Sequence, residues 1–242
     1  VEHYLQSWNQ FLQTNASVLK FVPASGAASR MFKDLYEFLD SEENAPIKPA
    51  EKAFFEHIHS FAFYQQLNEV CQSNNQKTID ELIQDGHYKN IVENLLQKTG
   101  LNYGSLPKGL LTFHTYPYEK RTPLQEHLVE GSLYANTASG DVNIHFTVSK
   151  EHRRLFEKHL EASIKIYEKN LKSKFHIEFS EQKPSTDTIA VDANNEPFID
   201  NNLPVFRPGG HGALIANLND LNADVIFIKN IDNVVIDRQK EA

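Results

Sequence analysis

Cysteine is almost absent from this sequence of 242 residues, in which Cys71 is the only one. A single thiol excludes an internal disulfide framework and a zinc site built from cysteines. Long apolar runs are missing too, because no stretch reaches the roughly 18 residues of a membrane-spanning helix and no signal-like apolar block occurs. We therefore expect a protein of the reducing cytoplasm that has no membrane partner.

Basic residues are also fewer than acidic residues. The 24 lysines and arginines face 32 aspartates and glutamates, which leaves a formal net charge of −8. No chain-wide field attracts nucleic acid, so we expect no nucleic acid as a partner. An anionic ligand has to be held by a local arrangement of groups. Hydrophobic residues make up 40% of the chain, which is enough to bury the core of one large domain.

Strand-like and helix-like segments alternate along much of the chain. Strands are predicted at residues 18–22, 142–148, 175–179, 188–192 and 225–228. Helices are predicted at residues 4–17, 123–134, 150–170 and 213–221. This order indicates an α/β fold, a Rossmann-like three-layer α/β/α arrangement with a mostly parallel sheet.

Only helical patterns occur in the middle of the chain, from about residue 49 to residue 98. Within this stretch, Thr78 and Glu81 form the capping box that opens a helix. We expect a single domain over residues 1–242 with a helical insertion at about residues 41–100.

The first loop that could carry chemistry follows the strand at residues 18–22. Residues 24–30 read Ala-Ser-Gly-Ala-Ala-Ser-Arg, and such small side chains let backbone N–H groups approach a phosphate. Arg30 can add a bidentate contact to phosphate oxygens. The loop matches neither a Walker motif nor a dinucleotide-binding fingerprint, since Gly26 is its only glycine. A tight strand-to-helix turn is the alternative interpretation.

A lysine and a glycine-rich loop are the next two candidates. Lys108 lies between a proline and a glycine, and this constrained backbone suits a fixed cation, although a surface turn has the same pattern. Residues 207–212 read Arg-Pro-Gly-Gly-His-Gly. Three glycines in four positions predict unusual backbone dihedral angles or the close approach of a ligand. An ordinary turn is again the alternative, but His211 inside the loop favours a ligand.

Asp232 is the last candidate, because it follows the apolar strand at residues 225–228. An aspartate at the carboxyl end of a central strand can hold a hard cation such as Mg²⁺, and the carboxamides beside it can orient the ligand. An Asx turn that closes the strand is the alternative. Open α/β sheets bind ligands at the carboxyl ends of their strands, so we expect all four segments at that edge.

Taken in order, the four segments resemble the UDP-sugar pyrophosphorylases, in both their glucose and N-acetylhexosamine branches, and a bacterial group of unknown function allied to them. The resemblance spans roughly residues 18–237. It implies the nucleotide-diphospho-sugar transferase fold and a nucleotidyltransferase. Such an enzyme transfers a uridylyl or other nucleotidyl group from a nucleoside triphosphate, chiefly UTP, to a sugar 1-phosphate and releases pyrophosphate. It also implies Mg²⁺ as the cofactor.

The same resemblance implies roles for individual residues. Arg30 would contact the β- and γ-phosphates and Lys108 the α-phosphate, both as catalytic residues, and Asp232 would be a metal ligand. The residues that would bind the nucleotide are Ala24, Ser25, Gly26, Ala27, Gln182, Gly209, Gly210 and His211. Gln182 resembles the glutamine that reads uracil in these enzymes.

Two departures from the family leave alternatives open. Ala28 and Ser29 replace the second glycine and the threonine of the family's first loop. The family also continues with strands that complete the sugar pocket, so we expect either a truncated chain or the absence of the acceptor site. A non-catalytic nucleotide-binding or sensor domain is one alternative, with the helical insertion as its partner surface. A glycosyltransferase is another, which the lack of an Asp-x-Asp motif disfavours.

Overall fold

The computed structural model describes residues 2–240, and it divides into two compact units. One unit, which we name the sheet unit, comprises Val1–Ser25 together with His127–Ala242. The other, the helical unit, is the continuous segment Gly26–Glu126. The ends of the predicted domain, Val1, Glu241 and Ala242, lie outside the described residues. The helices expected at about residues 41–100 all belong to the helical unit.

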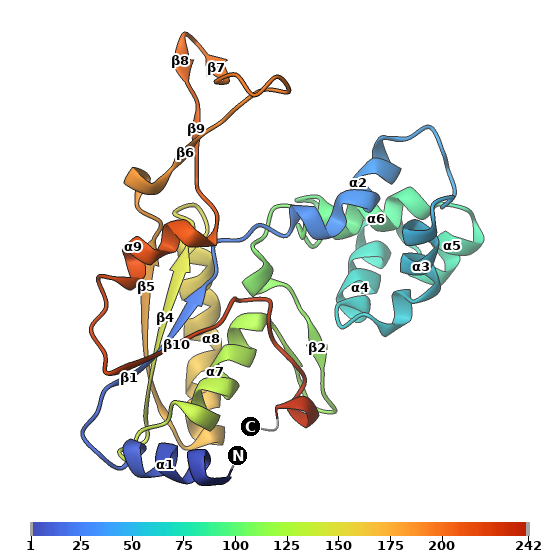
Figure 1. The fold of residues 1–242 in the computed structure, drawn as a ribbon. Coiled ribbons are helices and arrows are strands. Elements are labelled where there is room, and N and C mark those ends of the chain that lie inside the picture. Colours follow the sequence, from blue (N-terminus) through green and yellow to red (C-terminus); the bar gives the residue numbers. More distant parts are fainter. Residues whose placement is uncertain (1, 241–242) are drawn as a thin grey trace. The chain divides into compact units, whose positions relative to one another are not determined.

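The sheet unit contains a parallel sheet with the strand order β10-β1-β4-β5 (Figure 1). Its strands are β1 (Val18–Pro23), β4 (Asp141–Val148), β5 (Lys174–Glu181) and β10 (Val225–Ile228). Every neighbouring pair runs parallel, with Val18 opposite Val225 and Leu19 opposite Asn143. The prediction of an α/β fold with a parallel sheet is therefore confirmed.

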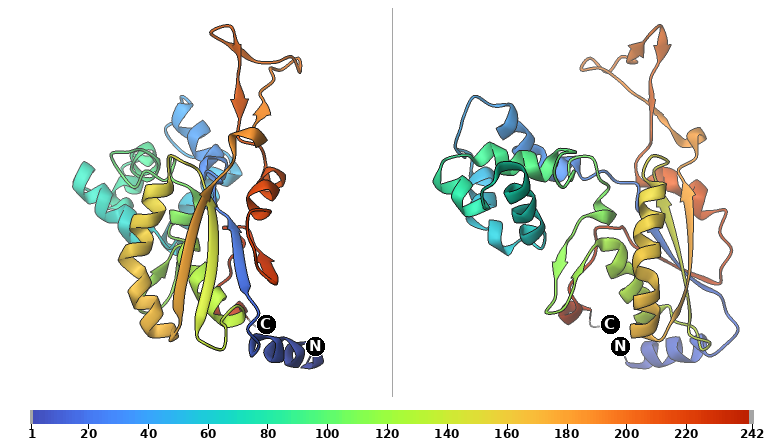
Figure 2. Two further views of the ribbon diagram at one scale, coloured as in Figure 1. Left: turned by 90° about the vertical axis from the view of Figure 1, so that its left-hand side faces the viewer. Right: turned by 180° about the vertical axis from the view of Figure 1, so that it is seen from behind.

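Helices cover both faces of this sheet (Figure 2). They are α7 (Pro123–Tyr134), α8 (Arg153–Leu171), the short α9 (Ile215–Leu218) and, near the amino ends of the strands, α1 (Glu2–Leu12). On one face, Phe146 packs against His127 of α7, and Phe179 packs against Phe156 of α8. On the other face, Asn217 of α9 donates a hydrogen bond to Ser180.

Two predictions in the sheet unit are wrong in detail. The strand predicted at residues 188–192 is only β6 (Thr188–Ile189), which pairs with β9 (Phe206–Arg207) outside the main sheet. Beyond it, β7 (Ile199–Asp200) pairs with β8 (Leu203–Pro204). Ile189 is 44% exposed, so this antiparallel ribbon has no buried face that would draw it into the sheet.

The helix predicted at residues 213–221 is also shorter than expected. It consists of the 3-10 helix η5 (His211–Leu214) followed by α9, which ends before Asn219 and Asp220. Asparagine and aspartate side chains compete for backbone hydrogen bonds and favour the end of a helix.

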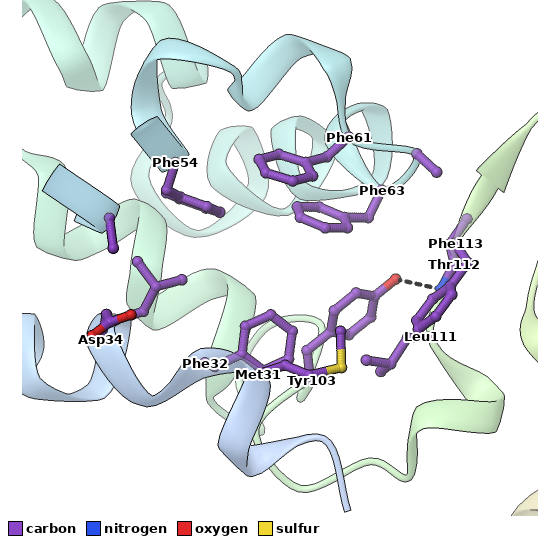
Figure 3. A pocket seen from close by; sticks show the side chains of 13 residues that line it. Met31, Phe32, Asp34, Phe54, Phe61, Phe63, Tyr103, Leu111, Thr112 and Phe113 are labelled. Carbon is purple, nitrogen blue, oxygen red and sulfur yellow. Dashed lines mark hydrogen bonds between the residues drawn. The ribbon is translucent and has the colours of Figure 1, made fainter. Parts of the chain in front are cut away.

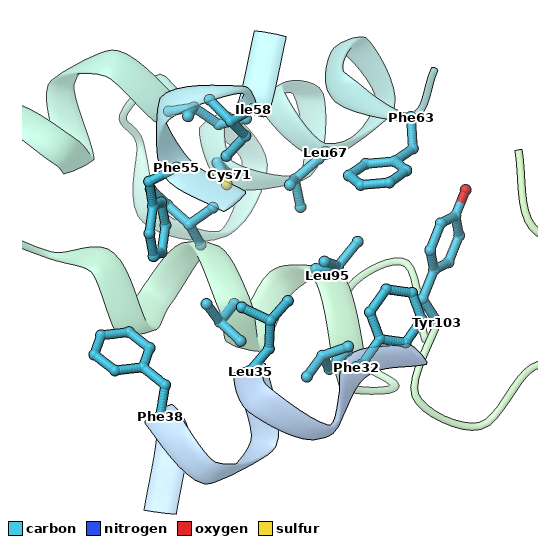
Figure 4. Packing of buried hydrophobic residues seen from close by; sticks show 14 of the residues in the cluster. Phe32, Leu35, Phe38, Phe55, Ile58, Phe63, Leu67, Cys71, Leu95 and Tyr103 are labelled. Atoms are coloured by element: carbon cyan, nitrogen blue, oxygen red, sulfur yellow. The ribbon is translucent and has the colours of Figure 1, made fainter. Parts of the chain in front are cut away.

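The helical unit has its own hydrophobic core (Figure 4). Its helices are α2 (Lys33–Asp40), α3 (Pro49–Glu56), α4 (Tyr64–Asn75), α5 (Ile79–Gln84) and α6 (Tyr88–Leu96). A short hairpin of β2 (His114–Thr115) and β3 (Lys120–Arg121) completes it. The predicted capping box of α5 is present, since Thr78 Oγ1 accepts a hydrogen bond from Glu81 N and Glu81 Oε2 accepts one from Thr78 N. In the described part of the chain we find no helix with the length and apolar character needed to cross a bilayer.

Candidate functional site

The strand order of the main sheet reverses between β1 and β10. The chain moves from β1 to β4 and β5 and then returns to the other side of β1 to form β10. The carboxyl ends of two such strands flank the crevice in which open α/β sheets bind their ligands. In the sheet unit, the segments that leave these two ends are therefore the candidate site.

Two of the predicted segments leave the sheet at this switch point. Ala24 and Ser25 follow β1, and Ala24 N donates to the Thr147 carbonyl of β4 at 2.8 Å. Asp232 follows β10, and its neighbour Ile231 N donates to the Pro23 carbonyl at 3.0 Å. The Asp232 segment thus runs beside the end of β1, as the sequence predicted, and Asp232 is half-buried there.

The predicted loop at residues 24–30 is divided between the units, because the sheet unit ends at Ser25. In the helical unit, its second half pairs with the segment that contains Lys108. Ala27 forms an antiparallel bridge with Pro107, and Lys108 N donates to the Gly26 carbonyl at 3.2 Å. Lys108 opens the 3-10 helix η3 (Lys108–Leu110), while Arg30 is exposed on η1 (Ser29–Phe32).

This pairing brings together two motifs that are far apart in the sequence. Two backbone hydrogen bonds connect residues 26–28 to residues 106–108, so the loop that leads to Arg30 is attached directly to the segment that contains Lys108. The Lys108 segment lies wholly within the helical unit.

The glycine-rich loop at residues 207–212 follows the ribbon strand β9. It lies beside Gln182, whose side chain follows β5 and donates to Thr186 Oγ1 at 3.2 Å. A Cβ atom on Gly209 would stand 2.9 Å from the Thr186 carbonyl oxygen and 3.6 Å from Gln182 Nε2. The structure therefore brings Gln182 and Gly209 together.

The unusual dihedral angles expected of this loop are not found. Among the described residues, only Gly86 and Gly140 are glycines with positive φ. Gly209 is required by the close approach of Thr186, but a Cβ on Gly210 or Gly212 would meet nothing within 4 Å. The fold itself thus explains only the first of the three glycines, and for the other two the close approach of a ligand and an ordinary turn both remain interpretations. The exposed His211 opens η5 next to them.

The surroundings of Asp232 suit one mode of metal binding. In residues 2–240 no three histidine, cysteine, aspartate or glutamate side chains gather into a metal-binding group. Mg²⁺ does not need such a cage, because it is often held by one or two carboxylates together with the phosphates of its ligand. A half-buried carboxylate at the switch point fits that mode.

A buried charge cluster, which the sequence reasoning missed, lies next to the Asp232 segment. Lys20 of β1 is fully buried and donates to Glu130 of α7 at 3.1 Å. Lys229, directly after β10, donates to both oxygens of Glu130 at 2.8 and 2.9 Å. From the same helix, His127 Nε2 donates to the Ile231 carbonyl at 3.2 Å. Glu130 and His127 thus fix the backbone that leads into Asp232.

Burial dominates the electrostatics of this cluster. It lowers the pKa of Lys20 from 10.5 to about 7, against the opposing effect of Glu130. Burial, with the charge of Lys20 second, also lowers the pKa of His127 well below its usual range, so this imidazole is neutral. Among the residues that the structure describes, its Nδ1 atom has no hydrogen-bond partner. One sequence feature could have revealed this cluster: Lys20 lies between apolar neighbours in a central strand. A charged group occupies such a position only with a partner.

A second buried network surrounds Glu126 in the helical unit. Glu126 is fully buried and accepts hydrogen bonds from His114 Nδ1 at 2.8 Å and from the Tyr116 hydroxyl at 2.7 Å. The Arg121 guanidinium lies 4.1 Å from the centre of the Tyr116 ring and 3.5 Å from Glu126. The carboxylate sets the orientation of His114, and sequence spacing gave no indication of this network because it depends on the β2–β3 hairpin.

The fold and the candidate site define an α/β protein in which a parallel sheet carries a carboxylate and a small-residue loop at its switch point. The family described as a domain of unknown function, DUF4301, matches residues 1–242. The chain therefore belongs to the DUF4301 family. No curated protein and no solved structure matches it.

Proposed function

We propose that this protein is a nucleotidyltransferase of the nucleotide-diphospho-sugar transferase type, with a Rossmann-like sheet. In this reaction an oxygen of a sugar 1-phosphate attacks the α-phosphorus of UTP or another nucleoside triphosphate. The bond from the α-phosphorus to the bridging oxygen breaks, and pyrophosphate leaves with the electron pair. The observation that carries the proposal is the switch point, where the loop after β1 and Asp232 after β10 lie side by side.

The reaction asks the protein for positioning and charge neutralisation. The attacking phosphate is already ionised, so no general base is required. In the helical unit, Arg30 and Lys108 supply two cations for the phosphates, and the backbone pairing between their segments keeps both in place. Mg²⁺, when bound, would add Lewis-acid stabilisation of the developing charge, with Asp232 as its protein ligand.

The sheet unit would supply recognition of the nucleoside. Gln182 presents an amide beside Gly209, and an amide can donate to and accept from a uracil edge. Gly210 carries no side chain that would obstruct a ring or a ribose, and the exposed His211 follows it. The proposal thus gives a role to Gly210, which packing leaves unexplained.

Pyrophosphate release tests this proposal. The full chain is incubated with UTP, Mg²⁺ and a panel of hexose and N-acetylhexosamine 1-phosphates. Lys108→Ala should lower the rate by about 100-fold or more, because one charge contact to the transition state is lost. Lys98→Ala removes an exposed lysine of the same unit and serves as the matched control.

Two results would change the assignment. Unchanged turnover in Lys108→Ala would remove this lysine from the mechanism. Calorimetric binding of UTP and Mg²⁺, without release of pyrophosphate in the presence of any of the sugar phosphates, would favour the nucleotide-binding sensor over the enzyme.

A further inference from the structure

The helical unit contains a pocket of about 400 Å³ that the proposed reaction does not use (Figure 3). It opens beside η1 and α2 and reaches the segment after η3. Its lining consists of Met31, Phe32, Asp34, Leu35, Ala50, Phe54, Phe61, Ala62, Phe63, Tyr103, Leu111, Thr112 and Phe113. Neither Arg30 nor Lys108 belongs to this lining, so the pocket is distinct from the predicted phosphate contacts.

Aromatic rings form two opposing walls of the pocket. Phe54, Phe61 and Phe63 lie on one wall, and Phe32 and Tyr103 lie on the other (Figure 3). Within the first wall, the rings of Phe61 and Phe63 stack with centroids 5.0 Å apart and an interplanar angle of 7°. The two walls touch where Phe63 and Tyr103 pack edge to face with centroids 5.4 Å apart, and beside this contact a flat ring system can stack on one wall and meet the edges of the other.

The polar groups of the lining restrict the charge of the occupant. Asp34 is the only charged residue, so the pocket offers no cation to a phosphate, sulfonate or carboxylate and repels an anion. The Tyr103 hydroxyl already accepts a hydrogen bond from Thr112 N at 3.1 Å. The hydroxyl keeps its own proton to donate, but an anionic ligand would lose its hydration here with no cation to compensate its charge.

Size and packing also favour a small molecule. Ligand pockets for small molecules typically measure about 300–1,000 Å³, and this one falls at the lower end of that range. Phe63, Tyr103 and Leu111 in its walls are core residues that would gain dispersion contacts from an apolar occupant. A ring that fills the slot therefore stabilises the helical unit as well as binding to it.

We propose that this pocket is a binding site for an uncharged, planar aromatic small molecule. The site stands independently of nucleotidyl transfer, since none of the residues assigned to that reaction lines it. Met31 and Phe32 share η1 with Arg30, and Leu111 directly follows η3, which begins at Lys108. An occupant would thus contact the residues next to both predicted phosphate-binding cations.

Fluorescence titration of the full chain with N-phenyl-1-naphthylamine tests the proposal, because this neutral probe consists of two aromatic ring systems. We expect saturable binding and a rise in the midpoint of thermal unfolding. The sulfonated analogue 1-anilinonaphthalene-8-sulfonate differs mainly by its negative charge. It should bind at least about tenfold more weakly if Asp34 and the lack of a cation set the selectivity.

Variants at the exposed rim locate the binding site. Ala50 is exposed and Met31 is 50% exposed, so tryptophan at either position can fold while it obstructs the slot. Ala50→Trp and Met31→Trp should each weaken probe binding by about tenfold or more. Ala53→Trp is the matched control, because Ala53 is exposed on the same helix but does not line the pocket.

Three outcomes would overturn the proposal. The first is the absence of saturable binding of the neutral probe. The second is equal affinity for the sulfonated analogue, which would refute the charge argument. The third is binding that Ala50→Trp and Met31→Trp leave unchanged, or that Ala53→Trp weakens equally, which would place the probe elsewhere.

Discussion

Lys20 shows how one residue can make the stability of the sheet unit depend on pH. Its ammonium group is enclosed by Glu130, the Tyr134 ring at 5.1 Å and the backbone carbonyl of His127. Lys229 and Lys240 add two further positive charges that lower its pKa. The single buried carboxylate of Glu130 thus accepts hydrogen bonds from two lysines, and it compensates the desolvation of Lys20 only in part.

The pKa of Lys20 predicts a rise of stability with pH. Between its folded pKa of about 7 and its ordinary value of 10.5, the unfolded chain binds more protons than the folded chain. The cost of burying the charged lysine is fully present below about pH 7 and decreases as the pH rises through this window. Lys20→Met should therefore flatten the increase in the free energy of unfolding that urea titrations of the unaltered chain show from pH 7 to pH 9.

Lys174→Met is the control for this measurement, since Lys174 is exposed on β5 of the same sheet. Lys174→Met should retain the increase in the free energy of unfolding from pH 7 to pH 9. The upper limit of pH 9 is set by Cys71, because burial raises the pKa of this thiol to about 11, and above the ordinary thiol pKa of 9 its contribution to stability falls with pH and offsets that of Lys20. A profile that is the same in Lys20→Met and the unaltered chain would contradict the assignment of the pH dependence to Lys20.

At the scale of elements, the loop from β9 to η5 contains two adjacent glycines, Gly209 and Gly210, whose surroundings differ. Gly209 lies against the Thr186 carbonyl and the Ala213 side chain, whereas Gly210 faces open space with an ordinary φ of −68°. The first glycine serves packing, whereas the proposed function assigns the second to contact with the nucleotide. This difference makes the two positions a matched pair.

Alanine substitutions separate the two reasons. Gly209→Ala places a Cβ 2.9 Å from the Thr186 oxygen and 3.0 Å from Ala213 Cβ, and it should lower the free energy of unfolding by about 1–3 kcal/mol. Gly210→Ala should change stability by no more than about 0.5 kcal/mol but weaken the calorimetrically measured binding of UTP. Equal stability losses in both variants, or unaltered UTP binding in Gly210→Ala, would count against this division.

At the scale of the whole molecule, the chain consists of two units with separate cores. Every residue of the core cluster built around Leu67 and Leu95 comes from Gly26–Glu126, a continuous segment. The sheet unit has a core of its own, in which Gly131 lets α7 lie directly on Val142 and Ile144 of β4. Contiguous segments with their own cores commonly open as cooperative units.

Hydrogen exchange can test whether the units open separately. A Cβ on Gly100 would overlap the backbone of Asn94 in α6, so Gly100→Ala should destabilise the helical unit by about 1–3 kcal/mol or more. Protection should then fall in residues 26–126 and remain in β1, β4 and β5. Gly131→Ala is the converse variant, because it should lower protection in the sheet unit and leave residues 26–126 protected. Loss of protection throughout the chain in Gly100→Ala would show that the units unfold together.

Local patterns in the sequence were sufficient to predict most of the elements. The apolar runs of β1, β4, β5 and β10 and the capping residues Thr78 and Thr122 act through their immediate neighbours, so their effects can be read along the chain. The ribbon at β6 and the short α9 were mispredicted. Whether Ile189 is buried depends on what packs against it, and the sequence does not contain that information.

The candidate site was predictable only in part. Asp232 at the end of β10 and Ala24 after β1 followed from strand ends, which local pattern reveals. The pairing of residues 26–28 with residues 106–108 could not be predicted, because the helical segment between them had to fold first. Lys20 and Glu130 were missed for the same reason, since a buried ion pair is visible only when both partners are placed.

The sequence by itself determined an α/β protein with a parallel sheet, a helical stretch in its middle, an acidic net charge and no internal disulfide. These properties depend on composition and on periodicities of two and 3.6 residues, which are local. Only the tertiary structure decided that β10 lies beside β1, that Glu130 binds both Lys20 and Lys229, and that aromatic side chains from five segments enclose a pocket. Such contacts join residues that are distant in the chain, and burial and close packing rather than local propensity select them.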